Sequence, residues 1–228
     1  ADLLAASPAY SDQSGVDWKT AAASAAKVLN HIGGVDGMDP TGWTWYCNVD
    51  DIEKLSPTES PAEILWRGER AKSLSLEEDN FPPTLYGNGR INPTQNLVDA
   101  FPMLNGYPVS HLSGEYDENL PYDNRDPRLE AYILYNGCKA GNTNKEIFTA
   151  ADGTTNDALN KVVGRSTRTG YYLRKLLRQD ISLDPNAKAD QYHYTPRIRY
   201  TEIFLAYAEA ANQAYGPQDK GGNGYSAY

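Results

Sequence analysis

The sequence predicts a mainly α-helical protein in which tetratricopeptide-like helical hairpins carry a loop-rich insert and a small β-hairpin. Two observations predict this class. Alanine-rich segments with helical periodicity stand near both ends of the chain, and the stretch between them is mostly irregular. Glycine and proline number 19 and 14 among 228 residues, so long loops should connect a modest amount of regular structure. We therefore expect a helical hairpin over 1–32, a loop-rich ligand subdomain over 33–194 and a returning helix within 195–228.

The first segment has the pattern of two helices joined by a short turn. A short apolar helix in "ADLLAASPAYS" should stop near Pro8, because proline cannot continue a helix. The second helix should begin at Asp17, a good acceptor for the free N–H groups of a first turn, and end at Gly33. Its expected apolar face comprises Trp18, Ala21, Ala22, Ala25, Val28, Leu29 and Ile32.

Short elements are expected inside the loop-rich subdomain. Residues 62–68 form an apolar, strand-like run. In "NPTQNLVDAF" (92–101), Asn92 should cap a short helix, with Pro93 at its first position and Gln95 where a capping box places it. The residues expected to face the core are Leu97, Val98 and Phe101.

Two further segments predict the β-hairpin. Residues 129–135 alternate between two faces and end at Asn136-Gly137, a pattern typical of a strand followed by a turn. Residues 169–178 form either its antiparallel partner or a short helix.

The last helix has signals at both ends. Thr195 should cap it, Pro196 should be its first residue, and Gly216 with Pro217 should end it. One apolar arc comprises Tyr200, Ile203, Phe204, Tyr207, Ala211, Ala214 and Tyr215. Ile198 and Leu205 lie on a second arc, roughly 150° away. A helix that is apolar on two sides packs between neighbours, as in stacked helical repeats.

An internal similarity links the two ends of the chain. "LLAASPAYSDQSGVDW" and "FLAYAEAANQAYGPQD" share an apolar pair, the alanine spacing, a tyrosine and a glycine break. These stretches suggest repeated tetratricopeptide-like units that bracket the insert, although chance similarity between alanine-rich helices is the alternative.

Composition narrows the function classes. The formal charge of −9 argues against binding a nucleic-acid backbone, which requires clustered Lys and Arg. The chain has 17 Tyr and 4 Trp but only 4 Phe, a choice that favours half-solvated rings at interfaces or sugar platforms. Cys47 and Cys138 fit no metal or redox spacing, and their pairing is left open. The two ends, "ADLLAAS" and "GGNGYSAY", suggest a piece of a longer protein.

No enzymatic motif stands out. The sequence has no GxSxG elbow, no phosphate loop and no HExxH, and its histidines are isolated from one another. "DGTTND" (152–157) only loosely resembles a calcium loop, because the downstream Glu is missing. We predict no catalytic residue, no metal site and no cofactor.

Loops rich in aromatic residues give a stronger indication of function. A sugar presents apolar C–H faces and a hydroxyl periphery, so a binder needs flat rings beside amide, acid and guanidinium groups. Three loops have this composition, and their candidate binding residues are Trp43, Trp45 and Tyr46; Tyr86, Asn88 and Arg90; and Tyr107, Tyr116 and Tyr122. The alternative is that these rings fold back to anchor long loops.

An ordered set of motifs resembles the SusD/RagB family. It consists of "LLAASPAYS", "DWKTAAASAAKVL", "NPTQNLVDAF", "YDNRDPRLEAYILYNG", "TGYYLRKLL" and "PRIRYTEIFLAYAEAANQAYG", and it extends over nearly the whole chain. The resemblance implies a mainly helical fold with tetratricopeptide-type hairpins under a loop-rich ligand subdomain. It also implies a lipid-anchored protein on the outer membrane of Bacteroidota, seated on a SusC-like TonB-dependent transporter, which captures oligosaccharides without cleaving them.

Two other functions stay open at this point. A tetratricopeptide-like groove could bind a peptide or a protein, and a helical glycoside hydrolase is the third possibility. The hydrolase ranks last because no acidic residue stands out in the sequence.

Overall fold

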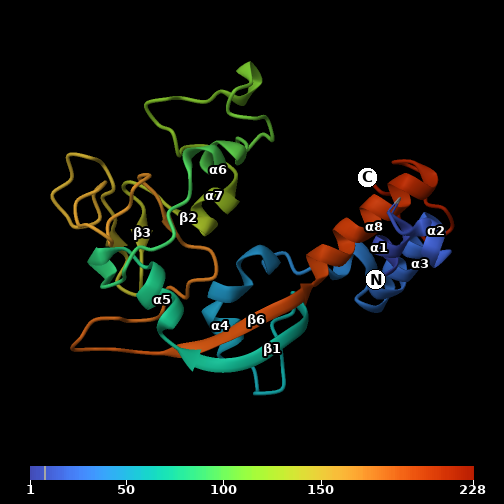
Figure 1. Cartoon of the computed structure of the whole chain (residues 1–228), viewed down its shortest axis with the longest axis horizontal. Coiled ribbons are helices and arrows are strands. Elements are labelled where there is room, and N and C mark those ends of the chain that lie inside the picture. Colours follow the sequence, from blue (N-terminus) through green and yellow to red (C-terminus); the bar gives the residue numbers. More distant parts are fainter. Residues whose placement is uncertain (8) are drawn as a thin grey trace. The chain divides into compact units, whose positions relative to one another are not determined.

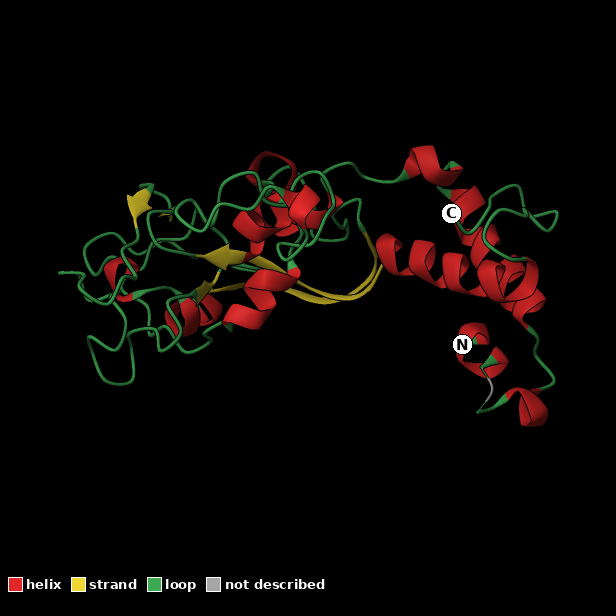
Figure 2. Cartoon of the chain, turned by 90° about the horizontal axis from the view of Figure 1, so that it is seen from above, coloured by secondary structure: helices red, strands yellow, loops and turns green. Residues whose placement is uncertain are grey.

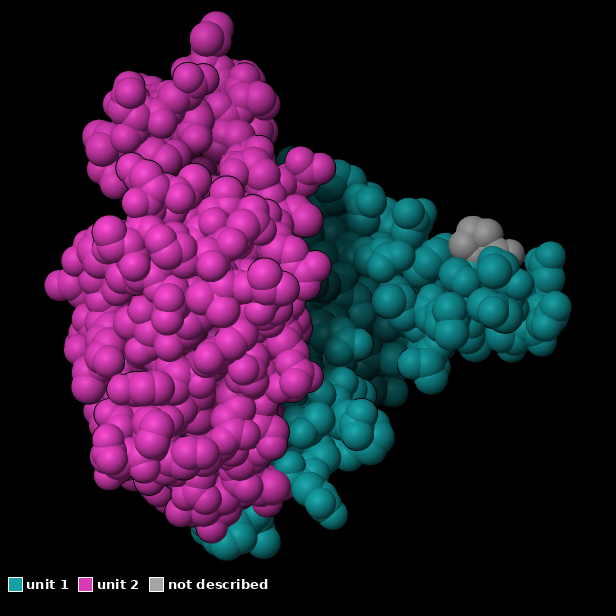
Figure 3. Space-filling view, turned by 60° about the vertical axis from the view of Figure 1, so that its left-hand side comes forward, with its two compact units in different colours: residues 1–45, 55–69, 195–228 teal, residues 46–54, 70–194 magenta. Residues whose placement is uncertain are grey.

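The computed structural model describes residues 1–7 and 9–228, and the chain divides into two compact units. The first unit comprises residues 1–45, 55–69 and 195–228, and the second comprises 46–54 and 70–194 (Figure 3). Pro8, where we expected the first helix to stop, lies outside the described residues. Helices dominate the regular structure, and the strands form only two-stranded sheets in the described part.

The first unit is a small helical bundle. Its elements are α1 (Asp2–Ala6), α2 (Ser11–Ser14), α3 (Trp18–His31), the 3₁₀ helix η1 (Gly34–Gly37) and α8 (Tyr200–Tyr215). The long helices α3 and α8 pack against each other (Figure 1 and Figure 2). Their buried contact residues are Ala21, Ala22, Ala26 and Leu29 on α3, and Tyr207, Ala210 and Ala211 on α8. Alanine side chains are small, so the two backbones approach closely and Tyr207 fills the remaining space.

Local signals set both ends of α3 as predicted. The Asp17 carboxylate accepts a hydrogen bond from the Thr20 N–H at 2.8 Å, which satisfies a donor of the first turn. After the helix, Gly33 adopts a left-handed backbone with φ of +93°, a conformation that suits glycine.

The predicted start of α8 is wrong. Thr195 and Pro196 lie in strand β6 (Gln191–Arg199), which pairs with β1 (Ile64–Ser73), and the helix begins only at Tyr200. A two-stranded ribbon has two edges, so it tolerates a proline without an N–H. The first turn of α8 is capped from a distant part of the chain: Glu63 accepts from Tyr200 N–H through its backbone oxygen and from Thr201 N–H through its carboxylate.

The other end of α8 agrees with the prediction, whereas its second apolar arc does not. The helix ends at Gly216, whose N–H donates to the carbonyl of Asn212. Ile198 belongs to the strand, and Leu205 is 67% exposed. Among the described residues of the chain, the arc that contains Tyr207 is the one buried against another helix.

The second unit is built from short elements joined by loops. The helices are α4 (Val49–Ile52), α5 (Ser75–Asn80), α6 (Gln95–Ala100) and α7 (Pro127–Tyr132), with 3₁₀ turns η3 (Pro83–Leu85) and η4 (Leu112–Gly114). A further 3₁₀ helix, η2 (Gly42–Cys47), spans the boundary between the units. Strand β2 (Ile133–Leu134) pairs antiparallel with β5 (Tyr172–Leu173), and β3 (Lys139–Ala140) pairs with β4 (Lys145–Glu146).

The observed start of the helix predicted over 92–101 differs from the prediction. Helix α6 begins two residues later than predicted, because Thr94 rather than Asn92 caps it and accepts from Leu97 N–H at 3.3 Å. The Asn92 side chain instead donates to Gly89 and accepts from the N–H of Arg168. Val98 is buried as expected, whereas Leu97 is exposed.

The strand expected over 129–135 is mostly a helix. Asp126 caps α7 by accepting from Arg128 N–H at 2.8 Å, and Pro127 occupies the first helical position. These two residues favour a helix, although the alternation of apolar residues favours a strand. Only Ile133 and Leu134 form a strand. Its partner is the 169–178 segment, which takes the antiparallel strand over Tyr172–Leu173.

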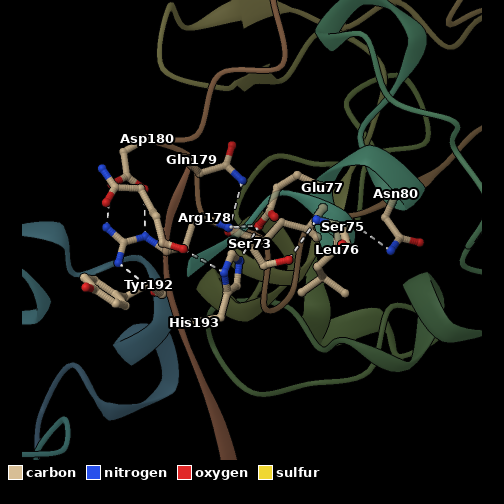
Figure 4. Close-up of polar contacts among 12 residues, drawn as sticks. Ser73, Ser75, Leu76, Glu77, Asn80, Arg178, Gln179, Asp180, Tyr192 and His193 are labelled. Carbon is tan, nitrogen blue, oxygen red and sulfur yellow. Dashed lines mark hydrogen bonds and ion pairs between the residues drawn. The ribbon is translucent and has the colours of Figure 1, made fainter. Parts of the chain in front are cut away.

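A buried carboxylate joins three segments of the second unit. Glu77 on α5 is 0% exposed, and its Oε1 accepts from the backbone N–H of Arg178 at 2.8 Å and lies 3.0 Å from Nε2 of His193 on β6 (Figure 4). Arg178 is itself buried and donates through its guanidinium to Asp180 and to the carbonyl of Tyr192. The polar cluster borders an apolar core that includes Phe81, Leu134, Ile147, Tyr172, Leu177 and Ile181.

Two further observations concern cysteines and membranes. Cys47 and Cys138 are both free thiols. No helix in the described part of the chain is long and apolar enough to cross a bilayer.

We predict that Tyr207→Ala destabilises the first unit by about 2–4 kcal/mol, because it removes a buried ring from the α3–α8 contact. All four tryptophans belong to this unit, so urea unfolding followed by tryptophan fluorescence reports on it. The control is Leu205→Ala on the same helix, which should change the free energy of unfolding by less than about 0.5 kcal/mol. Equal effects of the two changes would contradict this description of α8.

We further predict that Glu77→Ala costs roughly 3–5 kcal/mol, because it leaves buried donors without an acceptor. Its neighbour Glu78 forms only a surface ion pair with Lys188, so Glu78→Ala should cost about 0–1 kcal/mol. Urea unfolding followed by the near-ultraviolet circular dichroism of the tyrosines measures both. A Glu77→Ala protein as stable as Glu78→Ala would refute the role assigned to this carboxylate.

Candidate functional site

Two hollows lie in the second unit, and the larger of them is among the loops that join its short elements. It has a volume of roughly 520 Å³ and is lined by residues 119–123, 149–151 and 169–171 together with Asn136 and Leu159. This volume falls within the ~300–1,000 Å³ typical of small-molecule sites.

Tyrosine rings form one wall of this hollow. Tyr122 is stacked on Tyr135 with ring centroids 4.1 Å apart and an interplanar angle of 23°. Tyr171 meets Tyr122 edge-on, at 6.4 Å and 90°. Burial, together with the hydrogen bond of its hydroxyl to Tyr171, raises the pKa of Tyr122 well above its usual value, and burial raises the pKa of Tyr135 to about 12. Both hydroxyls are neutral at physiological pH, as the hydroxyl of an unperturbed tyrosine also is.

Polar side chains surround the rings. Asn119, Asp123, Asn136 and Thr169 all line the hollow. The Asn136 Oδ1 accepts from the N–H groups of Thr149 and Ala150, at 2.9 and 3.1 Å, which fixes the amide and leaves its nitrogen as the group that can donate to a ligand. The wall thus combines aromatic faces with amide, carboxylate and hydroxyl groups.

A buried threonine hydroxyl sets the position of Tyr171. The Thr167 Oγ1 accepts from the N–H groups of Thr169, Gly170 and Tyr171, each at 3.1 Å, and donates to the carbonyl of Tyr171 at 2.7 Å. The Tyr171 hydroxyl in turn donates to Oε1 of Gln95 on α6. Both ends of the Tyr171 residue are therefore held by hydrogen bonds.

A buried guanidinium holds the loop before Tyr122. Arg125 donates to the carbonyls of Val98 and Phe101 at the end of α6 and to the carbonyl of Pro121. A cation is favourable at the carboxyl end of a helix, where backbone carbonyls lack partners. Arg125 therefore fixes the residue that precedes Tyr122 against α6.

The GWTWYC segment does not supply an open platform in this structure. Trp43 and Trp45 belong to the first unit, and Tyr46 belongs to the second. Trp45 and Tyr46 are each 4% exposed, and the Tyr46 hydroxyl donates to the carbonyl of Ala131 at 2.9 Å. Trp43 is half-buried. Because Trp45 and Tyr46 are buried, we do not retain them as ligand platforms.

The second predicted loop borders a different hollow. Tyr86 lines a smaller hollow and is exposed, Asn88 is half-buried, and Arg90 forms a surface ion pair with Asp79 at 3.3 Å. Among the remaining candidates, exposed Tyr107 stacks on His111 at 4.8 Å, and the guanidinium of Arg125 lies 5.6 Å from the ring of Tyr116. Tyr122 is the predicted residue that lies in the larger hollow.

Sequence reasoning missed Tyr171, Asn136, Thr167 and Arg125. Tyr171 and Asn136 were interpreted only as parts of a hairpin, in "TGYY" and at the turn Asn136-Gly137. No local signal marks Thr167 or Arg125, because their partners lie on segments that only the tertiary fold brings near. No group of three or more His, Cys, Asp or Glu side chains that could hold a metal was found in the described residues.

A family model resolves the identity of the chain. The model of the SusD family matches residues 65–223, which include every residue of the larger hollow and more than half of the sequence. The chain belongs to the SusD family. The resemblance carried by the sequence motifs is thereby confirmed.

Solved structures agree with this assignment in fold. A SusD-like carbohydrate binding protein from Bacteroides fragilis is 24% identical with a TM-score of 0.54, and the match covers 67% of this chain and 30% of that protein. A second SusD-like protein from Bacteroides fragilis is 22% identical with a TM-score of 0.63, covering 87% and 40%. This SusD-family chain thus spans less than half the length of either structure. No curated protein matches it.

We predict that Thr167→Val displaces Tyr171 and destabilises the second unit by about 1–3 kcal/mol, because it preserves shape but leaves buried N–H groups without an acceptor. Urea unfolding measures the cost, and amide chemical shifts of Gly170 and Tyr171 report the displacement. Thr154→Val, at an exposed threonine, is the matched control and should be nearly neutral. Unchanged stability and shifts in Thr167→Val would show that the hydroxyl does not organise this turn.

Proposed function

We propose that this SusD-family chain binds an oligosaccharide, without cleaving it, in the hollow bounded by Tyr122 and Tyr171. The observation that carries the proposal is the composition of that hollow: tyrosine rings stand beside amide, carboxylate and hydroxyl groups on loops held in place by buried hydrogen bonds. Rings of this kind stack on the C–H faces of sugars, and the polar groups match their hydroxyls. A SusD-like relative of the same fold is described as carbohydrate binding, which supports this ligand class.

Binding without cleavage fits the acidic groups at the site. Glycoside hydrolysis commonly uses two carboxyl groups on opposite sides of the scissile bond, about 5–10 Å apart. Asp123 is the carboxylate among the described lining residues of the hollow, and no second one lines it there. We therefore assign the hollow to capture rather than to hydrolysis.

The wider role follows from the family. We propose that the whole protein is a lipid-anchored component of the external face of the outer membrane, and that it delivers glycan to a SusC-like TonB-dependent transporter. The helical first unit would serve as scaffold, and its tetratricopeptide-like character stays a prediction. A pull-down of the transporter from solubilised outer membranes, with the full-length protein as bait, tests this role, and failure to recover the transporter would count against it.

We predict that Tyr122→Ala weakens glycan affinity at least about tenfold, because it removes the ring that faces the hollow. Isothermal titration against a panel of neutral and acidic oligosaccharides first identifies a ligand and then compares variants. Tyr107→Ala, at an exposed tyrosine outside the hollow, is the control and should retain affinity.

Two results would reject parts of this proposal. No binding to any glycan by the wild-type chain would reject the function, and wild-type affinity in Tyr122→Ala would reject the site. Reducing sugar released on incubation with a bound oligosaccharide would show that the protein is an enzyme after all.

A further inference from the structure

A second, smaller hollow in the second unit carries a positive charge beside an exposed ring. It measures roughly 190 Å³, and Tyr86, Lys145 and Asp184 are among its lining residues. We propose that this hollow is a separate subsite for one carboxylate-bearing sugar residue of an acidic oligosaccharide, with Tyr86 as the stacking platform and Lys145 as the partner of the carboxylate. The inference rests on the proposed glycan binding and names the class of glycan.

The floor of this hollow is preformed. Phe81, Leu85, Ile181 and Leu183 line it, and all four are buried members of the core of the second unit. Because such cores are close-packed, the floor does not need to order when a ligand arrives.

Tyr86 has an exposed side chain and an uncommon backbone conformation. Its φ is +65°, a left-handed value that costs a tyrosine roughly 1 kcal/mol or more, and its side chain is 46% exposed. Two local contacts maintain this conformation. The N–H of Tyr86 closes the 3₁₀ turn by donating to the carbonyl of Pro83. The next residue, Gly87, lies so close to the carbonyl of Phe81 that a side chain would not fit there. Strained residues of this kind gather at ligand sites.

The β3–β4 hairpin places a cation above that ring. Gly141 in its turn packs so closely on Leu85 that an added Cβ would lie 2.8 Å from the leucine Cδ2, and its N–H donates to Oε1 of Gln179. This contact sets the hairpin next to Tyr86, and the Nζ of Lys145 lies 5.4 Å from the centroid of the Tyr86 ring. Throughout residues 1–7 and 9–228, no carboxylate forms an ion pair with Lys145.

A carboxylate that lines the same hollow restricts the ligand class to sugar acids. Asp184 lines the same hollow, and one of its oxygens accepts from the N–H of Asn186. A simple anion has no donor to offer this carboxylate, and a neutral sugar has no charge to offer Lys145. A uronic acid residue has hydroxyl donors for Asp184, a carboxylate for Lys145 and a C–H face for Tyr86.

The size of the hollow limits how much of the ligand it takes. Its volume is below the ~300–1,000 Å³ of sites that hold a whole drug-sized molecule. It therefore accommodates a single sugar residue, and the rest of the oligosaccharide continues over the surface.

The test compares acidic oligosaccharides with their uncharged counterparts. Trigalacturonic acid and a glucuronate-containing hyaluronan tetrasaccharide, each beside its methyl ester, are titrated into the ¹⁵N-labelled chain and followed by amide chemical shifts. We expect at least one acid to shift the amides of Tyr86, Gly87, Thr143 and Lys145, and its ester to bind at least about tenfold more weakly. Lys145→Gln should abolish the preference for the acid, whereas Lys139→Gln on the paired strand should keep it.

Each other outcome overturns the subsite. The subsite is rejected if acid and ester bind with equal affinity, or if Lys145→Gln keeps the preference for the acid. It is also rejected if the amide shift changes are confined to residues 119–123 and 169–171. If neutral glycans bind at Tyr122 while neither acid reaches Tyr86, this inference fails and the proposed function stands. If no oligosaccharide of any charge binds, both fail.

Discussion

The buried carboxylate of Glu77 is the constraint on which the second unit depends. A carboxylate without water or partners would cost several kcal/mol, so the chain must bring donors to it. The donors come from the backbone of Arg178 and the ring of His193, which lie on segments far from α5 in the sequence. Phe81 follows α5 directly, and Leu177 and Ile181 lie near Arg178 in the sequence, so the donors that reach Oε1 of Glu77 also bring these core residues together. Phe81, Leu85, Ile181 and Leu183 of this core line the smaller hollow, so the same cluster supports that site.

Local signals set both ends of α3 where the sequence predicted them. Asp17 and Gly33 bound α3 as expected, since each acts on residues within its own turn. The start of α8 was predicted wrongly for the opposite reason: Glu63, the residue before β1, caps it from far away in the sequence, and Thr195 and Pro196 are as acceptable at an edge strand as at a helix start. In α7, alternation of apolar residues favoured a strand, whereas the Asp126 cap and Pro127 decided for a helix. In α7 the cap residues were stronger evidence than the apolar alternation.

The candidate site was predictable in chemistry and only partly in position. Tyrosine-rich polar loops pointed to sugar recognition, and Tyr122 does line the larger hollow. Composition does not distinguish a ring that faces a hollow from one that anchors a loop, which is why Trp45 and Tyr46 looked the same as Tyr122 in the sequence. The difference arises from hydrogen bonds over long distances in the chain, such as those of Arg125 to α6 and of Tyr171 to Gln95.

The hydrogen bonding of the larger hollow also separates two kinds of residue. Thr167 and Arg125 hold backbone in place and are themselves buried, whereas Asn119 and Asp123 are exposed, and the side-chain hydrogen bond of Asn119 stays within its own loop, to Asp117. Natural selection can therefore exchange the exposed groups at little cost in stability, while the buried ones are retained. After a gene duplication, substitutions at the exposed lining residues would therefore alter the hollow of one copy while its fold stayed unchanged.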